Sequence, residues 1–317
     1  MNAMERLNKL VKEKGVFLAG LDPDINKILP MYEEGVRGEE LRKIFIDMKV
    51  YTEEVMTDFC ISYINAIKDE VAAIKINIAF FEACGISMDK FLYIARKAKE
   101  AGLFVIADVK RADIGNTSKQ YAEAFLKKDS PIDAITINPY FGTDGVKPFL
   151  DVAKENEKGV FVLVKTSNAS SSEIQDLELK DGKMVYQKVA ELVKEWGEYV
   201  KDSDEEEYSL VGAVVGATHP VEAKLLRETM PNTFFLVSGY GSQGATADDI
   251  VVNFDDNGGG AIVNSSRGIM FAYEKEGVNV DKWQEESRKA AISARKELCG
   301  AVNSYLKNKL LWKVRSS

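Results

Sequence analysis

Short apolar runs recur along the whole chain, and longer stretches with a mixed apolar and polar pattern separate them. Each run is rich in Val, Ile and Ala and has the length of one strand. Continuous apolar runs of this kind are typical of parallel strands that are buried on both faces. We therefore predict eight buried strands, at 15–20, 72–78, 103–108, 133–138, 159–165, 210–216, 233–238 and 260–264.

The stretches between the runs repeat apolar residues at close to the helical period of 3.6. In 39–68, for example, Ile44, Met48, Tyr51 and Val55 follow this spacing. Strands that alternate with helices predict an α/β fold, a single (β/α)8 TIM barrel. An open, doubly wound parallel sheet is the alternative, because one sequence does not show closure. Helices are expected at 39–68, 88–100, 116–128, 183–200, 220–229 and 281–306.

The chain has 317 residues, whereas a (β/α)8 barrel needs only ~250. The surplus falls near 24–70 and 172–208, which we interpret as helical insertions. No linker rich in Pro, Gly or Ser divides the sequence. Residues 1–317 are therefore predicted to form one domain, with a C-terminal helix at 281–306.

Composition excludes several classes of protein. Lys and Arg number 42 against 50 Asp and Glu, and a net charge of −8 disfavours a nucleic-acid binder. His219 is the single histidine, so a multi-histidine metal site is excluded. Cys60, Cys84 and Cys299 are widely spaced and suggest no disulfide framework. No targeting segment or membrane-spanning run is present, so we expect a cytoplasmic protein with no membrane partner.

Charged residues interrupt the apolar pattern where the first three strands end. Asp22 follows the first strand, Lys75 lies in the second, and Asp108 and Lys110 end the third, with Asp113 in the next loop. Chemistry in a (β/α)8 barrel sits at these carboxyl ends. Asp108 and Lys110 are two residues apart, so on an extended strand they face the same side. Alternating lysines and aspartates favour protonated lysines, which predicts a lysine proton donor. A structural ion-pair network is the alternative.

Three later loops have the composition of a ligand site. A glycine-rich loop with Gln243 follows the seventh strand, and Arg267 follows the eighth. Many barrels bind phosphate with these two loops, because glycines expose backbone N–H groups and arginine adds a bidentate contact. Ser167, in the polar loop after the fifth strand, is expected to contact ligand heteroatoms.

The segment 108–117, Asp-Val-Lys-Arg-Ala-Asp-Ile-Gly-Asn-Thr, resembles the Asp-x-Lys-x-x-Asp-Ile signature of the orotidine 5′-phosphate decarboxylase family. The length, the Thr-Ser-Asn loop and the Gly-Ala-Thr-His-Pro segment look like the longer, type 2 subgroup. Further residues fall where that family places functional groups: Asp22, Lys75, Ser167, Gln243 and Arg267.

This resemblance implies decarboxylation of orotidine 5′-monophosphate to uridine 5′-monophosphate and CO2, without a metal or organic cofactor. It implies that Asp108 lies beside the substrate carboxylate and that Lys110 stabilises and protonates the C6 carbanion. Lys75 would contact the ribose and hold Asp108. Asp113 would complete this tetrad from the other subunit of a homodimer, with Ile114 and Thr117 beside it.

The resemblance also assigns the substrate-binding residues. Asp22 would bind ribose hydroxyls, Ser167 would read the pyrimidine, and Gln243 and Arg267 would bind phosphate. Two residues depart from shorter family members. Ser238 stands where Pro is frequent, and Ser266 precedes the arginine where Gly is common.

Two other functions remain open from the sequence. A related metal-dependent sugar-phosphate decarboxylase or aldolase-type synthase would share the Asp-x-Lys-x-x-Asp motif but need magnesium held by carboxylates, for which Glu82 is a candidate. A catalytically inactive nucleotide-phosphate binding protein is the third hypothesis, which the intact Asp108, Lys110 and Asp113 disfavour.

Overall fold

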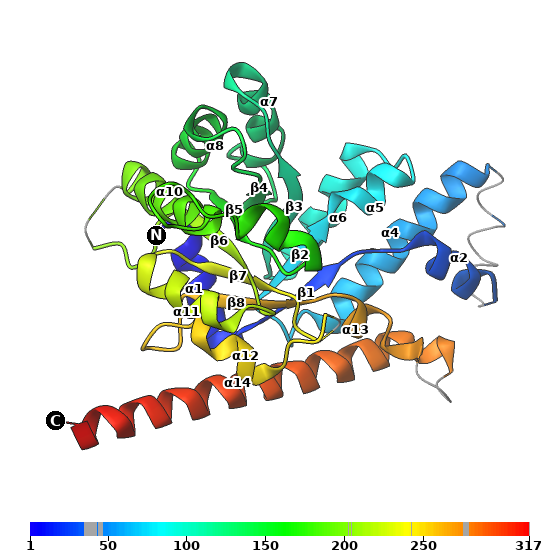
Figure 1. Cartoon of the computed structure of the whole chain (residues 1–317). Helices are drawn as coiled ribbons and strands as arrows, with labels where there is room; N and C mark the ends of the chain where they lie inside the picture. The colour runs from blue at the N-terminus through cyan, green and yellow to red at the C-terminus, as the bar shows by residue number, and fades with distance from the viewer. Residues whose placement is uncertain are drawn as a thin grey trace.

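Eight parallel strands close into a barrel in the order in which they occur along the chain (Figure 1). The computed structural model describes residues 1–34, 43, 47–201, 203, 205–241, 243–274 and 279–316, with side chains as far as 311. β1 pairs with β8, with Leu18 opposite Asn264, so the predicted barrel is confirmed and the open sheet is wrong. The strands are β1 Phe17–Leu21, β2 Ala73–Asn77, β3 Phe104–Arg111, β4 Ala134–Ile137, β5 Gly159–Lys165, β6 Val211–Gly216, β7 Phe235–Ser238 and β8 Ala261–Ser265.

All eight predicted runs form strands because both faces of each strand are covered. Side chains such as Phe17 and Phe161 are fully buried. The burial is continuous along β1, β4 and β6, which explains why these strands read as unbroken apolar runs. Lys75, Asp108 and Lys165 are the charged exceptions among the buried strand residues.

Helices surround the barrel and lie between successive strands (Figure 1). The predicted helices 88–100 and 220–229 match the observed bounds. α4 begins at Met48 because the Asp47 side chain caps it, accepting from the N–H groups of Lys49 and Val50 at 2.8 and 3.2 Å. Residues 39–42 and 44–46 of that predicted helix lie outside the described residues. The helices are α1 Ala3–Lys14, α2 Ile25–Glu34, α4 Met48–Ile67, α5 Ile78–Ala83, α6 Met88–Glu100, α7 Gly115–Leu126, α8 Thr143–Glu155, α9 Ser172–Gln175, α10 Val185–Val200, α11 Pro220–Thr229, α12 Ala247–Ile250, α13 Arg267–Met270 and α14 Trp283–Ser316, with 3₁₀ turns η1 Ala169–Ser171, η2 Val251–Asn253, η3 Ala272–Glu274 and η4 Val280–Lys282.

Some elements were not predicted. One of them is α8, which contains Pro148 and buries Val146, Phe149 and Leu150. The C-terminal helix is longer than the predicted 281–306 and runs along one side of the barrel against α4 (Figure 1).

The two ends of the barrel differ in how they are covered. α1 lies at the amino end, where Met4 Cε comes within 2.7 Å of the position that a Cβ on Gly159 would occupy. The carboxyl end is open and carries the polar residues of the site. The surplus stretch 24–70 holds α2 and α4, and 172–208 holds α9 and α10. The division into one domain with two insertions stays a prediction. Among the described residues, no helix is long and apolar enough to cross a membrane.

Candidate active site

A cavity of about 510 Å³ lies at the carboxyl ends of the strands. Seven of the ten predicted site residues line it, and they come from six different strands or the loops that follow them. The other three, Asp113, Ile114 and Thr117, do not line it. The lining residues are Asp22, Lys75, Asn77, Asp108, Lys110, Thr136, Leu163, Thr166, Ser167, Asn168, Gln175, Val214, Leu236, Ser238, Gly239, Tyr240, Gln243, Asn264, Ser265, Ser266 and Arg267.

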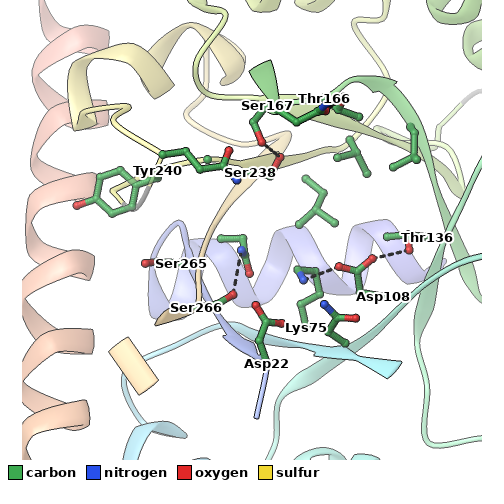
Figure 2. Close-up of a pocket in the computed structure, with 18 of the residues that line it drawn as sticks. Asp22, Lys75, Asp108, Thr136, Thr166, Ser167, Ser238, Tyr240, Ser265 and Ser266 are labelled. Carbon is green, nitrogen blue, oxygen red and sulfur yellow. Dashed lines mark hydrogen bonds and ion pairs between the residues drawn. The ribbon is translucent and has the colours of Figure 1, made fainter. Parts of the chain in front are cut away.

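Asp108 lies at the centre of the charged part of the cavity (Figure 2). Lys75 Nζ donates to Asp108 Oδ2 at 2.6 Å, and Lys110 Nζ donates to Oδ1 at 2.6 Å. Thr136 Oγ1 also donates to Oδ1, at 2.8 Å. The side chains of Asp108 and Lys75 are 7% and 9% exposed, whereas that of Lys110 is 51% exposed. The Lys110 ammonium is therefore the part of this cluster that reaches into the open cavity.

The buried pair is held in its ionised form. Burial alone would raise the pKa of Asp108, but the charges of Lys75 and Lys110 outweigh it and hold that pKa far below its ordinary value. Burial alone would lower the pKa of Lys75, but the nearby charges of Asp108 and Asp22 leave it above the ordinary value. An anionic carboxylate thus stands fixed beside two cations.

The backbone at Lys110 differs from the extended strand that the sequence suggested. Lys110 has φ +43°, in the left-handed region that non-glycine residues rarely adopt, at a cost of about 1–3 kcal/mol. Asp108 and Lys110 do both point into the cavity. The two residues therefore face the same side, as their spacing predicts, although β3 is kinked at Lys110.

Two polar atoms in the cavity wall are buried without a protein partner among the described residues. They are Asp22 Oδ1 and Asn264 Oδ1. Asp22 lies below Lys75 in Figure 2. Because buried acceptors without partners are costly, both oxygens are suited to accept from hydroxyl or amide groups of a ligand.

Hydroxyl and amide groups gather on the opposite side of the cavity from Asp108 (Figure 2). Ser167 Oγ lies 3.4 Å from Ser238 Oγ. Gly239 has φ +98°, and a Cβ there would lie 2.9 Å from Ser167 Cβ and 3.0 Å from Gln243 Oε1. The glycine therefore lets the loops after β5 and β7 approach each other, which brings Ser167 and Gln243 to one point.

Arg267 follows β8 and provides a further cation in the cavity lining. Its side chain is exposed and forms no ion pair with a described carboxylate, so its donors are available to an anion. The neighbouring Ser266 packs against β1, where a Cβ on Gly20 would lie 1.8 Å from Ser266 Oγ. Gly20 thus allows the ends of β1 and β8 to meet beneath the cavity.

Asp113, Ile114 and Thr117 lie on the outer surface, at the start of α7. Asp113 Oδ1 accepts from the adjacent N–H of Ile114 at 2.8 Å. The Ile114 side chain is 56% exposed, and nearby Tyr140 and Phe141 are also exposed, Tyr140 at 82%. The structure does not bring these three predicted residues into the cavity of their own chain.

Sequence reasoning missed several lining residues. Thr136 lay within an apolar run, where a threonine gives no chemical signal. Gln175 comes from the stretch interpreted as a surface insertion, yet its side chain accepts from Thr166 N at 2.9 Å and donates to Thr166 Oγ1 at 2.7 Å. The following Asp176 forms an ion pair with fully buried Lys165 at 2.5 Å. Hydrogen bonds and an ion pair therefore connect this insertion to the end of β5.

Glu82, the candidate magnesium ligand, lies outside the cavity lining and forms an ion pair with Arg111. Within the described part of the chain, no group of three or more His, Cys, Asp or Glu side chains is placed to hold a metal ion.

Comparison with known proteins identifies the family. The sequence model of the Orotidine 5′-phosphate decarboxylase / HUMPS family matches residues 40–278. The chain belongs to this family. The resemblance carried by 108–117 is thereby confirmed.

Similar members of the family match nearly the whole chain. An orotidine 5′-phosphate decarboxylase of Rhodopirellula baltica is 40% identical over 312 residues, which cover 95% of this chain and 100% of the relative. One of Caldicellulosiruptor bescii is 39% identical and covers 92% of this chain and 100% of the relative. The structure of a Leishmania donovani OMP decarboxylase has a TM-score of 0.70 at 29% identity, covering 96% of this chain and 99% of that chain.

Proposed function

We propose that this chain converts orotidine 5′-monophosphate to uridine 5′-monophosphate and CO2, the last step of de novo pyrimidine synthesis. Family membership over most of the chain supports this reaction. The observation that carries it is the Asp108 carboxylate, fixed between Lys75 and Lys110 at 2.6 Å in a cavity lined by polar groups. The predicted cytoplasmic location stays a prediction.

Lys110 is assigned the chemical step. The bond between C6 and the carboxylate carbon breaks, its electron pair stays on C6, and CO2 leaves. The ammonium of Lys110 stabilises this charge as it develops and then donates a proton to C6. The side chain of Lys110 is half exposed and can approach a ligand in the cavity. The side chain of Lys75 is buried and has less room to move.

Asp108 is assigned two effects. Its fixed negative charge lies where the substrate carboxylate would bind, so it disfavours the carboxylated ground state. The same carboxylate orients Lys110, because the Lys110 ammonium donates to Asp108 Oδ1. Lys75 offsets the cost of burying Asp108 and is placed to contact ribose hydroxyls together with Asp22.

Ser167, Gln243 and Arg267 are assigned to recognise the other ends of the nucleotide. Ser167 is assigned to contact the pyrimidine, and Gln243 and Arg267 are assigned to bind the phosphate; all three line the cavity. Binding energy from the phosphate, remote from C6, can organise the site as well as hold the substrate.

Replacing Arg267 with Ala should separate the contribution of the phosphate to binding from that of the nucleoside. We expect uridine 5′-monophosphate to bind about 10²-fold more weakly, because two charged hydrogen bonds to phosphate are lost. Uridine, which lacks phosphate, should bind within about threefold of the wild type. Calorimetric titration of both ligands measures this difference. Equal losses for nucleotide and nucleoside would show that Arg267 does not bind phosphate.

A homodimer is part of the proposal. Asp113, Ile114 and Thr117 lie outside their own cavity, and the surface beside them exposes Ile114, Tyr140 and Phe141. Exposed aromatic and aliphatic residues of this kind are enriched in protein interfaces. A twofold dimer through this surface would place Asp113 and Thr117 at the cavity of the other subunit.

Mixing two inactive variants tests this arrangement. Asp113→Ala and Lys110→Ala each damage the tetrad. If Asp113 acts on the other subunit, a mixed dimer holds one native site, so equal mixing should restore about one quarter of the wild-type sites. Subunits are exchanged by co-refolding and turnover is measured. No recovery, in a sample shown by native mass spectrometry to contain mixed dimers, would mean that Asp113 serves its own chain.

Product analysis tests the reaction itself. Purified protein incubated with orotidine 5′-monophosphate should release uridine 5′-monophosphate and CO2 in equal amounts. The metal-dependent alternative has less support, because Glu82 pairs with Arg111 instead of lining the cavity. Turnover of a sugar phosphate with none of the nucleotide would replace the proposal with that alternative.

A further inference from the structure

Thr136 of β4 has no role assigned above, yet it touches three successive residues of β3. Thr136 is 1% exposed. Its Oγ1 accepts from the backbone N–H groups of Val109 and Lys110, both at 3.0 Å, and donates to Asp108 Oδ1 at 2.8 Å. A hydroxyl has one donor and two acceptor positions, so all three are used inside the protein.

These bonds coincide with a break in the pairing of β3 and β4. Ala107 lies opposite Ile135, and the next pair is Arg111 opposite Ile137. β3 therefore advances four residues while β4 advances two, and Thr136 is the β4 residue inside this bulge. Bulges beside active sites redirect side chains. Here the bulge contains Lys110 with its left-handed φ of +43°.

We propose that Thr136 is the positioning residue that holds the Lys110 kink and the Asp108 carboxylate in one fixed geometry. The inference rests on the proposed function, because it concerns the reaction that Lys110 performs. The hydroxyl replaces the strand partner that the N–H groups of Val109 and Lys110 lose in the bulge. It also donates to Asp108 Oδ1 (Figure 2). The Lys110 ammonium donates to this same oxygen, so the hydroxyl fixes the acceptor of Lys110. Since its donor is already used, Thr136 acts through these residues and not on the substrate.

Thr136→Val tests the role with a side chain of nearly the same shape. A shift of about 1 Å in a catalytic group can cost about 10²-fold in rate, so kcat should fall by about that factor. Uridine 5′-monophosphate should bind within about threefold of the wild type, because the contacts assigned to phosphate and base lie elsewhere. Thr136→Ser keeps the hydroxyl and should recover kcat to within about tenfold.

Thr57→Val is the matched control. Thr57 is a buried threonine of α4 whose Oγ1 donates to Glu53 O at 2.7 Å, and it does not line the cavity. Its kcat should stay at the wild-type value. The inference is overturned if folded Thr136→Val keeps its kcat, if Thr136→Ser is as slow as Thr136→Val, or if nucleotide affinity falls as much as kcat.

A measurement on the wild type covers the case in which Thr136→Val does not fold. Residue-level hydrogen exchange should show slow exchange at the amides of Val109 and Lys110, because the Thr136 hydroxyl accepts from both. Fast exchange at these two amides, with slow exchange at Ile106, would overturn the inference. This result does not depend on substrate. A wild type without activity on orotidine 5′-monophosphate would instead refute the proposed function.

Discussion

Lys110→Ala should abolish turnover of orotidine 5′-monophosphate while the protein stays folded and still binds uridine 5′-monophosphate. The variant loses both the cation that stabilises the C6 carbanion and the proton that C6 receives, which together predict a loss of at least about 10⁴-fold. Lys110 is half exposed, so little packing is lost with it. Steady-state kinetics, thermal unfolding and nucleotide titration together measure the outcome.

Two further variants sharpen this experiment. Lys110→Arg keeps a positive charge on a group that does not give up its proton, so it should also turn over slowly while it binds nucleotide. Lys289→Ala removes a lysine of α14 that pairs with Glu285 on the surface, and it should keep full activity. Near-normal turnover in Lys110→Ala would remove Lys110 from its assigned role.

Asp108→Asn should have the largest effect on stability. The substitution leaves Lys75 buried beside a neutral amide, and breaking a buried ion pair in this way costs roughly 3 kcal/mol of the free energy of unfolding. Asp151→Asn is the matched control, because Asp151 pairs with Lys147 on the surface and should cost less than about 1 kcal/mol. Urea unfolding of both variants measures the difference.

The stability gap between Asp108→Asn and the wild type should also depend on pH in a stated direction. The pKa of Asp108 in the folded protein lies below its ordinary value of 3.8, because Lys75 and Lys110 favour the carboxylate. Its stabilisation is therefore fully present above about pH 5 and is lost as the pH falls through and below 3.8. The difference in the free energy of unfolding between the wild type and Asp108→Asn should be constant from pH 5 to pH 8. It should become smaller at pH 4 and below. A gap that narrows near neutral pH would contradict the ionised buried pair.

The strands were predictable from the sequence because a parallel strand in a closed barrel has no solvent face. The closed barrel was predicted from eight strands that alternate with helices, but the sequence does not show closure directly, since that depends on the pairing of Leu18 with Asn264, residues far apart in the chain. α8 was not predicted from the sequence, and it contains a proline. Pro148 follows the first turn of α8, and the apolar residues beside it hold the helix against the barrel.

The site was predictable where a charged residue interrupted an apolar run. Asp108, Lys75 and Lys110 were found in this way, and the structure brings them within hydrogen-bond distance. Residues without charge gave no such signal. Thr136 is recognisable only through the bulge that it fills, and Gln175 only through the contact between its insertion and Thr166.

The most direct test of the account is the initial rate of orotidine 5′-monophosphate loss, followed by absorbance in the presence of excess chelator. Lys110 Nζ, which lies 2.6 Å from Asp108 Oδ1, supplies the cation at C6, so the rate should be the same with and without chelator. Lys110→Ala should show no measurable rate in the same assay. A wild-type rate that disappears with chelator and returns with added magnesium would contradict this role of Lys110.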